Sequence, residues 1–355
     1  MGSCPALESL AGCSTAAAWT PRRASERAPG LFASRAGSWW RPQRRRCATG
    51  LVVLLGWCDH PGVVAYTLLA NHVPINAEII GANEHESHYV FDILYNNTTD
   101  LQPDVHSTDT HGTNAVNFAI LSMFGYQFAP RYRDIYDTVR TSLYGFKHPR
   151  QYDDAMRLKP VRKLLPNLII DEWENIQRIM VSLALKTTTQ HIIVGKLSAY
   201  ARQNKTRRAL WEYDHIIRSL YLLDYIDSPP LRRHVQRAMN RSESYHQLRR
   251  AVSYANYGKL RVKTEYEQQL WEACSRLVTN CIIYYNATIL SSLLSYKERT
   301  GDSQGAALLQ QVSPVAWQPI NLHGRYEFRK LPEAIDIDAI VQELSQLPIT
   351  QDLDD

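Results

Sequence analysis

The sequence predicts an α/β domain that is joined to a large, almost wholly helical part. Up to about residue 150, apolar runs follow the order strand, strand, helix, strand, helix, strand, which is typical of an α/β domain. Beyond Pro166, apolar residues recur mainly at helical spacing. The chain has 355 residues, of which 45% are hydrophobic and 21% charged, so it can bury a sizeable core.

The first strands are indicated by residue type and alternation. Val63–His72 is an apolar, partly β-branched run, which predicts a buried strand. Ile75–Gly81 alternates apolar and polar residues, which predicts a half-buried strand. A helix face follows over residues 89–94. Val105–Thr108 then predicts a short strand that ends in Asp109.

The remaining elements are indicated by helical periodicity and by stop signals. A helix over 116–124 ends at Gly125, and Phe128-Ala129 predicts one more strand. Further helices are expected after Asp171, around 210–220, from Ser228-Pro229-Pro230, over 248–255, and in a long stretch from Thr264 to about Leu294.

Residues 1–60 differ in composition from the rest of the chain. They hold eight Arg, no Lys and three acids. We expect an unrelated and mostly disordered segment here; an organelle transit peptide and a misjoined reading frame are the alternatives. No apolar run reaches the roughly 20 residues that span a bilayer, so we expect no membrane association.

Asp109 is the first candidate site residue. It follows a predicted strand, and carboxylates at strand ends of an α/β sheet emerge at the rim where sites are built. The structural alternative is an ordinary turn or helix-cap residue.

Glu243 is the second candidate. Between Arg232 and Lys263 lie seven Arg and two Lys but only this acid. It either neutralises its neighbours or provides a metal-binding carboxylate within a surface that holds DNA phosphates. We expect a helix to begin near Glu243, with His246 one turn further on the same face. Paired carboxylates suit phosphodiester chemistry, because two magnesium ions can neutralise charge on the attacking and leaving oxygens.

At these residues the chain resembles a known family. The blocks are ANHVPINAEIIGANEHESHYVFDILYNNTTD, HSTDTHGTNAVNFAI, FGYQFAPRYRDIYD, ESYHQLRRAVSYANYGKLR and SPVAWQPINLHGRYEF. They are similar to the C-terminal catalytic region of bacterial Tn-three family transposases of the DDE type. The similarity runs from about Gly62 to about Ala339, so we expect a region truncated on its N-terminal side.

The resemblance implies an RNase H-like core with a large helical insertion before the final catalytic Glu. It divides the chain into a core part (61–150), an insertion (151–240), core helices with the final Glu (241–300) and a tail (301–355). Asp109 matches the family's second acid. Glu243 matches the third, in Asn240–Glu243, where Ser242 replaces the usual Gly. Both would bind Mg²⁺, for which Mn²⁺ can substitute.

The family's first acid has no counterpart in this sequence. It lies in a motif like S-D-G-Q on a strand before the hairpin that begins here at Val63, and no such motif is present. Asp59 follows the apolar run Leu51–Leu55 and is the candidate substitute.

Cations near the two acids are the predicted DNA contacts: Arg131, Arg241, Arg249, Arg250, Lys259 and Arg261. A structural pair between Arg131 and Asp134 is an equal alternative, and His111 is expected to be a solvated loop residue.

Two functions therefore remain open. The first is DNA transposition, through magnesium-dependent nicking and strand transfer at transposon ends in the bacterial cytoplasm, at the nucleoid. The second is a non-catalytic remnant that binds DNA, or that pairs with itself or with an intact transposase. The missing first Asp makes catalysis by this chain alone doubtful. An unrelated helical structural protein is the third and weakest reading.

Overall fold

The computed structural model describes residues 47–55, 63–81, 84–199, 204–254, 262, 264–318, 320–324 and 335–346. All of them belong to one unit, Gly37–Asp355. Asp59, Lys259 and Arg261, three of the predicted site residues, lie outside the described residues.

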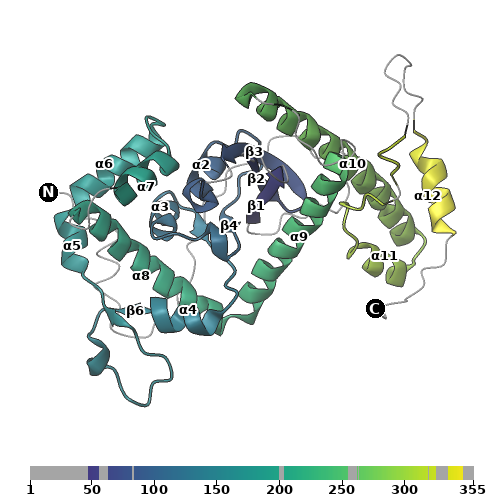
Figure 1. Ribbon diagram of the computed structural model, residues 1–355. Helices are drawn as coiled ribbons and strands as arrows, with labels where there is room; N and C mark the ends of the chain where they lie inside the picture. Colours follow the sequence, from purple (N-terminus) through teal and green to yellow (C-terminus); the bar gives the residue numbers. More distant parts are fainter. Residues whose placement is uncertain are drawn as a thin grey trace. The chain divides into compact units, whose positions relative to one another are not determined.

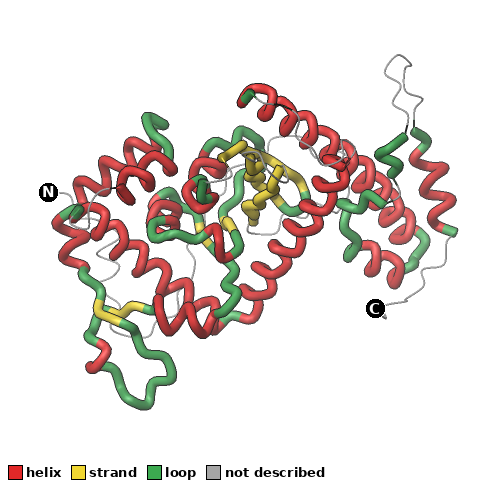
Figure 2. The backbone as a smooth tube through the Cα atoms, viewed as in Figure 1, coloured by secondary structure: helices red, strands yellow, loops and turns green. Residues whose placement is uncertain are grey.

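A five-stranded sheet organises the first half of the chain (Figures 1 and 2). Its strands are β1 (Cys47–Leu55), β2 (Val63–Ala70), β3 (Val73–Gly81), β4 (Val105–Ser107) and β5 (Gln127–Phe128). Their order in the sheet is β3-β2-β1-β4-β5. The β1/β2 and β2/β3 pairs are antiparallel, whereas β1/β4 and β4/β5 are parallel.

The central strand, β1, lies in the segment 1–60, which was expected to be mostly disordered. Within that segment, Cys47–Leu55 pairs with β2 from Ala48↔Ala70 to Leu55↔Val63. On its other edge, β1 pairs with β4. A β-branched apolar run satisfies its backbone hydrogen bonds when it enters a sheet between two strands. The rest of that segment, 1–46 and 56–60, lies outside the described residues.

Strand β2 is buried because helices cover both faces of the sheet. Tyr66 and Leu68 pack into the larger apolar cluster, together with residues of α2 (Val90–Tyr95) and α3 (Asn117–Met123). Ala65 and Leu69, whose side chains point to the other face, pack against later helices. This accounts for the continuous apolar sequence of β2.

The middle of the chain is mainly helical. The described elements here are η2 (Glu86–His88), η3 (Thr110–Gly112), α4 (Ile135–Ser142), β6 (Tyr144–Gly145), η4 (Pro149–Gln151), β7 (Arg162–Lys163), α5 (Pro166–Asp171), α6 (Trp173–Ala184), α7 (Gln190–Ala199) and α8 (Lys205–Asp227).

Two buried polar residues join the predicted insertion to the sheet domain. Asp214 of α8 accepts hydrogen bonds from the backbone nitrogens of Phe118 (2.9 Å) and Ala119 (3.3 Å) at the start of α3. Gln190 accepts from Phe91 N (2.6 Å) through its side chain. A carboxylate at a helix N-terminus is stabilised by the helix dipole. The insertion helices therefore share the core of the sheet domain.

Helix α9 (Pro229–Tyr254) is a single helix of 26 residues. The sequence predicted two helices, the second of which was to begin near Glu243; this was wrong. No Pro or Gly occurs between residues 231 and 254, so nothing in the sequence stops the helix. The predicted domain boundary at residue 240 lies inside α9.

Helix α10 (Glu265–Arg299) confirms the long predicted helix, and Thr264 and Glu267 form its capping box. Helices α11 (Ser303–Leu309) and α12 (Ile337–Ser345) pack on it within the predicted tail. Of the described helices, α10 alone has the length and apolar content that a membrane crossing requires. It packs against β3, α9, α11 and α12.

Candidate active site

Asp109 lies directly after β4 in a tight loop. One of its carboxylate oxygens accepts a hydrogen bond from Gly112 N (3.2 Å). A Cβ on Gly112 would lie 2.4 Å from Thr108 Cβ, so this loop requires glycine. The half-buried Asp109 therefore serves as a turn residue and also sits at the sheet rim, as both alternatives from the sequence require.

Glu243 lies in the middle of α9 with its side chain 57% exposed. Its carboxylate oxygens lie 3.8 Å from His246 Nδ1 and 3.5 Å from Arg250 Nη2. Burial and the Arg250 cation lower the pKa of His246, while Glu243 opposes that shift. Glu243 thus lies within ion-pair distance of the Arg250 cation on its own helix.

The elements that carry Asp109 and Glu243 both contact the central strand. Helix α9 lies along β1 and touches β4. In the β1/β4 register, Thr49 pairs with Ser107, the last residue of β4, and Asp109 lies two residues beyond this pair. Arg241 donates to Asn71 Oδ1 (3.1 Å) at the β2–β3 turn, which fixes α9 against the sheet.

The third carboxylate of the predicted triad is missing from this arrangement. The sequence of β1, CATGLVVLL, contains no Asp or Glu. Over the part of the chain that the structure describes, no group of three or more His, Cys, Asp or Glu is arranged to hold a metal ion. The described donor set therefore does not fit a three-carboxylate metal centre.

Sequence reasoning missed Glu86, which lies near Asp109. Helix η2, which carries Glu86, contacts η3, the turn that follows Asp109. Burial raises the pKa of the Tyr66 hydroxyl on β2, and the charges of Glu86 and Asp109 raise it further. Glu86 comes a few residues after the end of β3, and Asp109 comes shortly after the end of β4. The position after a strand could therefore have identified Glu86 as a candidate from the sequence.

Arg249 corrects a predicted DNA contact. Its side chain is fully buried, 3.9 Å from Glu272 Oε1 and with its guanidinium 5.6 Å from the centre of the Trp271 ring. The helical period places Tyr245, Leu248 and Arg249 on the face of α9 that packs inward. A side chain in this position cannot reach a DNA phosphate.

The other predicted contacts are placed differently. Arg250 is 63% exposed, on the outer side of α9.

Arg131 is half-buried, and its backbone nitrogen donates to Thr108 O (2.8 Å), which brings it beside the Asp109 loop. Asp134 caps α4 through Asp137 N (3.0 Å), and no ion pair between Arg131 and Asp134 occurs among the described residues. The side chain of His111 is outside the description.

Residues 57–326 match the family described as Tn3 transposase DDE domain. The chain belongs to this family. Strand β1 precedes the matched residues.

The relatives of this Tn3-family chain are transposases of named transposons. The transposase for transposon Tn3926 of Escherichia coli is 33% identical over 271 residues, which cover 76% of this chain and 27% of that protein. The transposase for transposon Tn1546 of Enterococcus faecium is 33% identical over 252 residues, covering 71% and 25%. The transposase for transposon Tn21 of Escherichia coli is 33% identical over 273 residues, covering 76% and 27%. The chain thus spans about a quarter of the length of these relatives.

Proposed function

We propose that this chain is an RNase H-like DDE transposase domain that holds transposon DNA but does not complete the strand-transfer site. The family implies DNA transposition, and DDE transposases generally use a divalent metal. The strand order β3-β2-β1-β4-β5, with two antiparallel and two parallel pairs, supports the RNase H-like assignment.

One observation carries the proposal: the strand beside Asp109 has no carboxylate. Strand β1 occupies the centre of the sheet between β2 and β4, and CATGLVVLL offers only apolar residues, Cys, Thr and Gly. Phosphodiester cleavage by this family needs negative charge neutralised on both the attacking and the leaving oxygens. Asp109 and Glu243 alone provide too few carboxylates to hold the metal ions that would neutralise this charge.

The residues that remain suit DNA holding. Arg250 on the outer side of α9 and Arg241 near the β2–β3 turn lie on the helix that crosses β1. Such cations bind phosphates without reading sequence. We place the protein in the bacterial cytoplasm with DNA as its partner, and we propose pairing with itself or with an intact transposase as a further association.

The test is nicking and strand transfer of a labelled transposon end with Mg²⁺ or Mn²⁺. The chain is compared with Asp109→Ala and Glu243→Ala. We expect all three proteins to show the same background cleavage, while the parent chain retains DNA binding that weakens with salt.

Cleavage by the parent chain that both substitutions abolish would contradict the proposal. It would support the catalytic alternative, in which a third acid completes the site. Asp59→Ala and Glu86→Gln would then identify that acid.

A further inference from the structure

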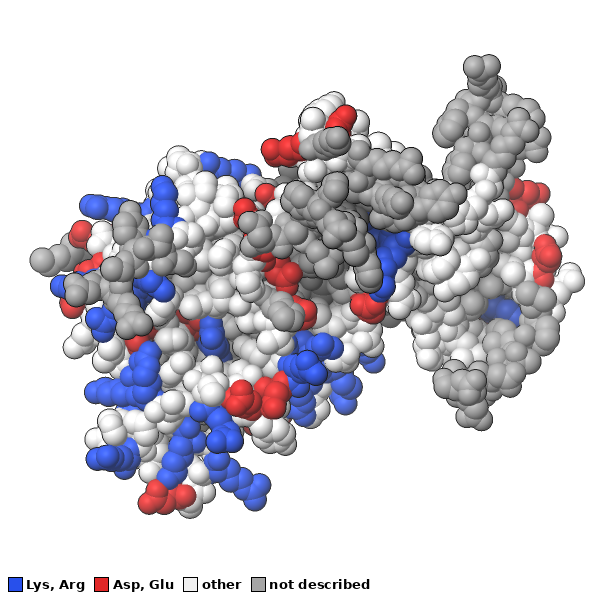
Figure 3. Space-filling view, viewed as in Figure 1, with Lys and Arg blue, Asp and Glu red and all other residues white. Residues whose placement is uncertain are grey.

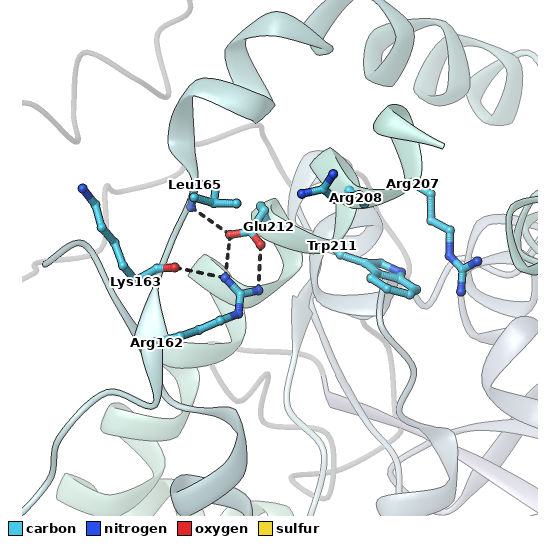
Figure 4. A pocket seen from close by; sticks show the side chains of 7 residues that line it. All are labelled: Arg162, Lys163, Leu165, Arg207, Arg208, Trp211 and Glu212. Atoms are coloured by element: carbon cyan, nitrogen blue, oxygen red, sulfur yellow. Dashed lines mark hydrogen bonds and ion pairs between the residues drawn. The ribbon is translucent and has the colours of Figure 1, made fainter. Parts of the chain in front are cut away.

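A pocket of about 630 Å³ lies between β7 and the first turns of α8, on elements other than those that carry Asp109 and Glu243. Figure 4 shows the side chains that line it. They are Arg162, Lys163, Leu165, Arg207, Arg208, Trp211 and Glu212.

One wall of the pocket is formed by an ion pair between the half-buried Arg162 and the buried Glu212. Arg162 donates to both carboxylate oxygens of Glu212, at 2.6 and 3.3 Å. Glu212, itself buried, also accepts from Leu165 N (2.9 Å). The Arg162 guanidinium lies 4.7 Å from the centre of the Tyr144 ring. A bidentate pair of this kind has a rigid geometry, and it neutralises the charge of Arg162.

Three further cations give the pocket its positive charge. Lys163 and Arg208 are exposed, and neither takes part in an ion pair among the described residues. The guanidinium of Arg207 lies 4.2 Å from the centre of the Trp211 ring. Figure 3 shows Lys and Arg side chains gathered over the part of the face where Figure 1 draws α5, α8 and β6.

The acid at the start of α6 forms no ion pair with Lys163 or Arg208 among the described residues. Glu172 accepts hydrogen bonds from Thr206 Oγ1 (2.6 Å) and Asn175 Nδ2 (2.8 Å). Because Arg162 already balances Glu212, the positive charges of Lys163 and Arg208 remain for a ligand.

We propose that this pocket binds one nucleotide of an unpaired DNA strand. Its phosphate contacts Lys163 and Arg208, and its base packs against Trp211 and Arg207. Positive charge interleaved with an aromatic ring is the chemistry that proteins use to hold single strands. A duplex fits less well, since its bases are stacked and their faces are covered. The inference rests on the proposed function, because it assigns a second DNA contact to the same protein.

The pocket is tested with the full chain and a fluorescently labelled oligothymidine strand, followed by anisotropy over a range of salt concentrations. Lys163→Ala and Arg208→Ala are each expected to weaken binding about 5- to 10-fold. Each should also reduce the salt slope, which is the slope of log binding constant against log salt concentration, by about 0.7, because one phosphate fewer is neutralised. Trp211→Leu is expected to weaken binding about 5- to 50-fold. The control is Arg178→Ala, which removes an exposed cation from α6.

The proposal is overturned if the Lys163 and Arg208 variants bind the strand as the Arg178 variant does. Both side chains are exposed, so their removal leaves the fold intact even where Trp211→Leu does not. Equal binding of a blunt duplex, with the same dependence on these residues, would also overturn it. So would tighter binding of an oligouridine strand, which would make the ligand RNA.

Failure of the pocket can be distinguished from failure of the proposed function. Binding of a transposon-end duplex by the Arg250→Ala variant tests the proposed DNA contact on α9, because Arg250 does not line the pocket. If Arg250→Ala weakens duplex binding while Arg208→Ala leaves strand binding unchanged, the proposed function stands and the pocket assignment fails. If no variant affects either DNA and the parent binds neither, both fail.

Discussion

The guanidinium of Arg249 lies inside the domain, where none of its three nitrogens has a hydrogen-bond partner among the described residues. Its neighbour Glu272 is also buried, and Arg276 Nε lies 3.8 Å from the second oxygen of that carboxylate. Removing one member of a buried pair leaves an uncompensated charge. We therefore expect Arg249 to contribute to stability, whereas the exposed Arg250 on the same helix is a proposed DNA contact.

We expect Arg249→Met to lower the free energy of unfolding by about 3 kcal/mol, because it leaves Glu272 with one cation in place of two. The double variant Arg249→Met, Glu272→Met should recover most of that decrease. Urea denaturation measures both. Arg250→Ala is the matched control and should change stability by less than about 0.5 kcal/mol. A single variant as stable as this control would show that the pair has no structural role.

Arg250→Ala should instead weaken DNA binding, since it removes an exposed cation from the outer side of α9. We expect affinity to fall about 5- to 10-fold at low salt and the salt slope to be smaller by about 0.9. Electrophoretic mobility shift of duplex DNA over several salt concentrations tests this. An unchanged slope would mean that α9 does not face the phosphates.

His215 makes the stability of the domain depend on pH. Burial lowers its pKa to about 4, with further lowering by Arg218 and Arg162. The unfolded chain takes up the proton near pH 6.5, whereas the folded chain does so only near pH 4. The contribution of His215 to stability is therefore fully present above about pH 6.5 and is lost as the pH falls through this window.

We expect His215→Gln to reduce the acid destabilisation between about pH 6.5 and 4 by about 1–3 kcal/mol, because glutamine takes up no proton. Urea unfolding at several pH values measures it. The control is His234→Gln on the exposed side of α9, which should follow the parent profile. Parallel profiles for parent and His215→Gln would contradict the prediction.

At the scale of elements, the proposed lack of activity depends on strand β1. The paired register ends at Thr49 and Ser107; if it continued for two more residues, Leu51 would lie beside Asp109, so Leu51 is the position chosen for a carboxylate. We expect Leu51→Asp to raise metal-dependent nicking of a transposon end above the parent chain. Val53→Asp is the control, because it puts the same charge about 7 Å further along the same strand. Circular dichroism establishes that both variants are folded.

Nicking by Leu51→Asp that also requires Asp109 and Glu243 would support the missing-acid explanation. No gain in a folded Leu51→Asp protein would show that more than one acid is lacking.

The sequence predicted elements whose pattern is local. Strand β2, strand β3 and helix α10 were expected from alternation, from apolar runs and from aromatic-rich helical spacing after Thr264. The central position of β1 was not, because pairing between Cys47–Leu55 and two other strands is a long-range property. The sequence predicted two helices in place of α9 because polar residues around Glu243 interrupt its apolar face. These residues do not interrupt the helical backbone.

The sequence indicated candidate site residues but not their environment. Asp109 after a strand and Glu243 on a helix both lie on elements that contact β1. The sequence did not distinguish the buried Arg249 from the exposed Arg250, because one helical step of about 100° separates the core from the surface. Glu86 approaches Asp109 only through the folding of η2 against η3.

For the whole molecule, the proposed function predicts interference with an active relative. If this chain occupies transposon ends without cutting them, it competes with an intact Tn3-family transposase for the same DNA. We expect co-expression to lower the transposition frequency of a matching element, and the Arg250→Ala variant to lower it less. An equal effect of both proteins would mean that interference comes from subunit pairing and not from DNA occupancy.

The position of β1 between β2 and β4 has an evolutionary consequence. That slot is filled by an extended apolar segment that precedes the family-matched residues, and it forms its backbone ladder without any acidic side chain. The backbone pairing of these nine residues therefore does not depend on an acidic side chain. Under the proposed function, selection could lose the catalytic activity and still keep a folded protein that holds DNA.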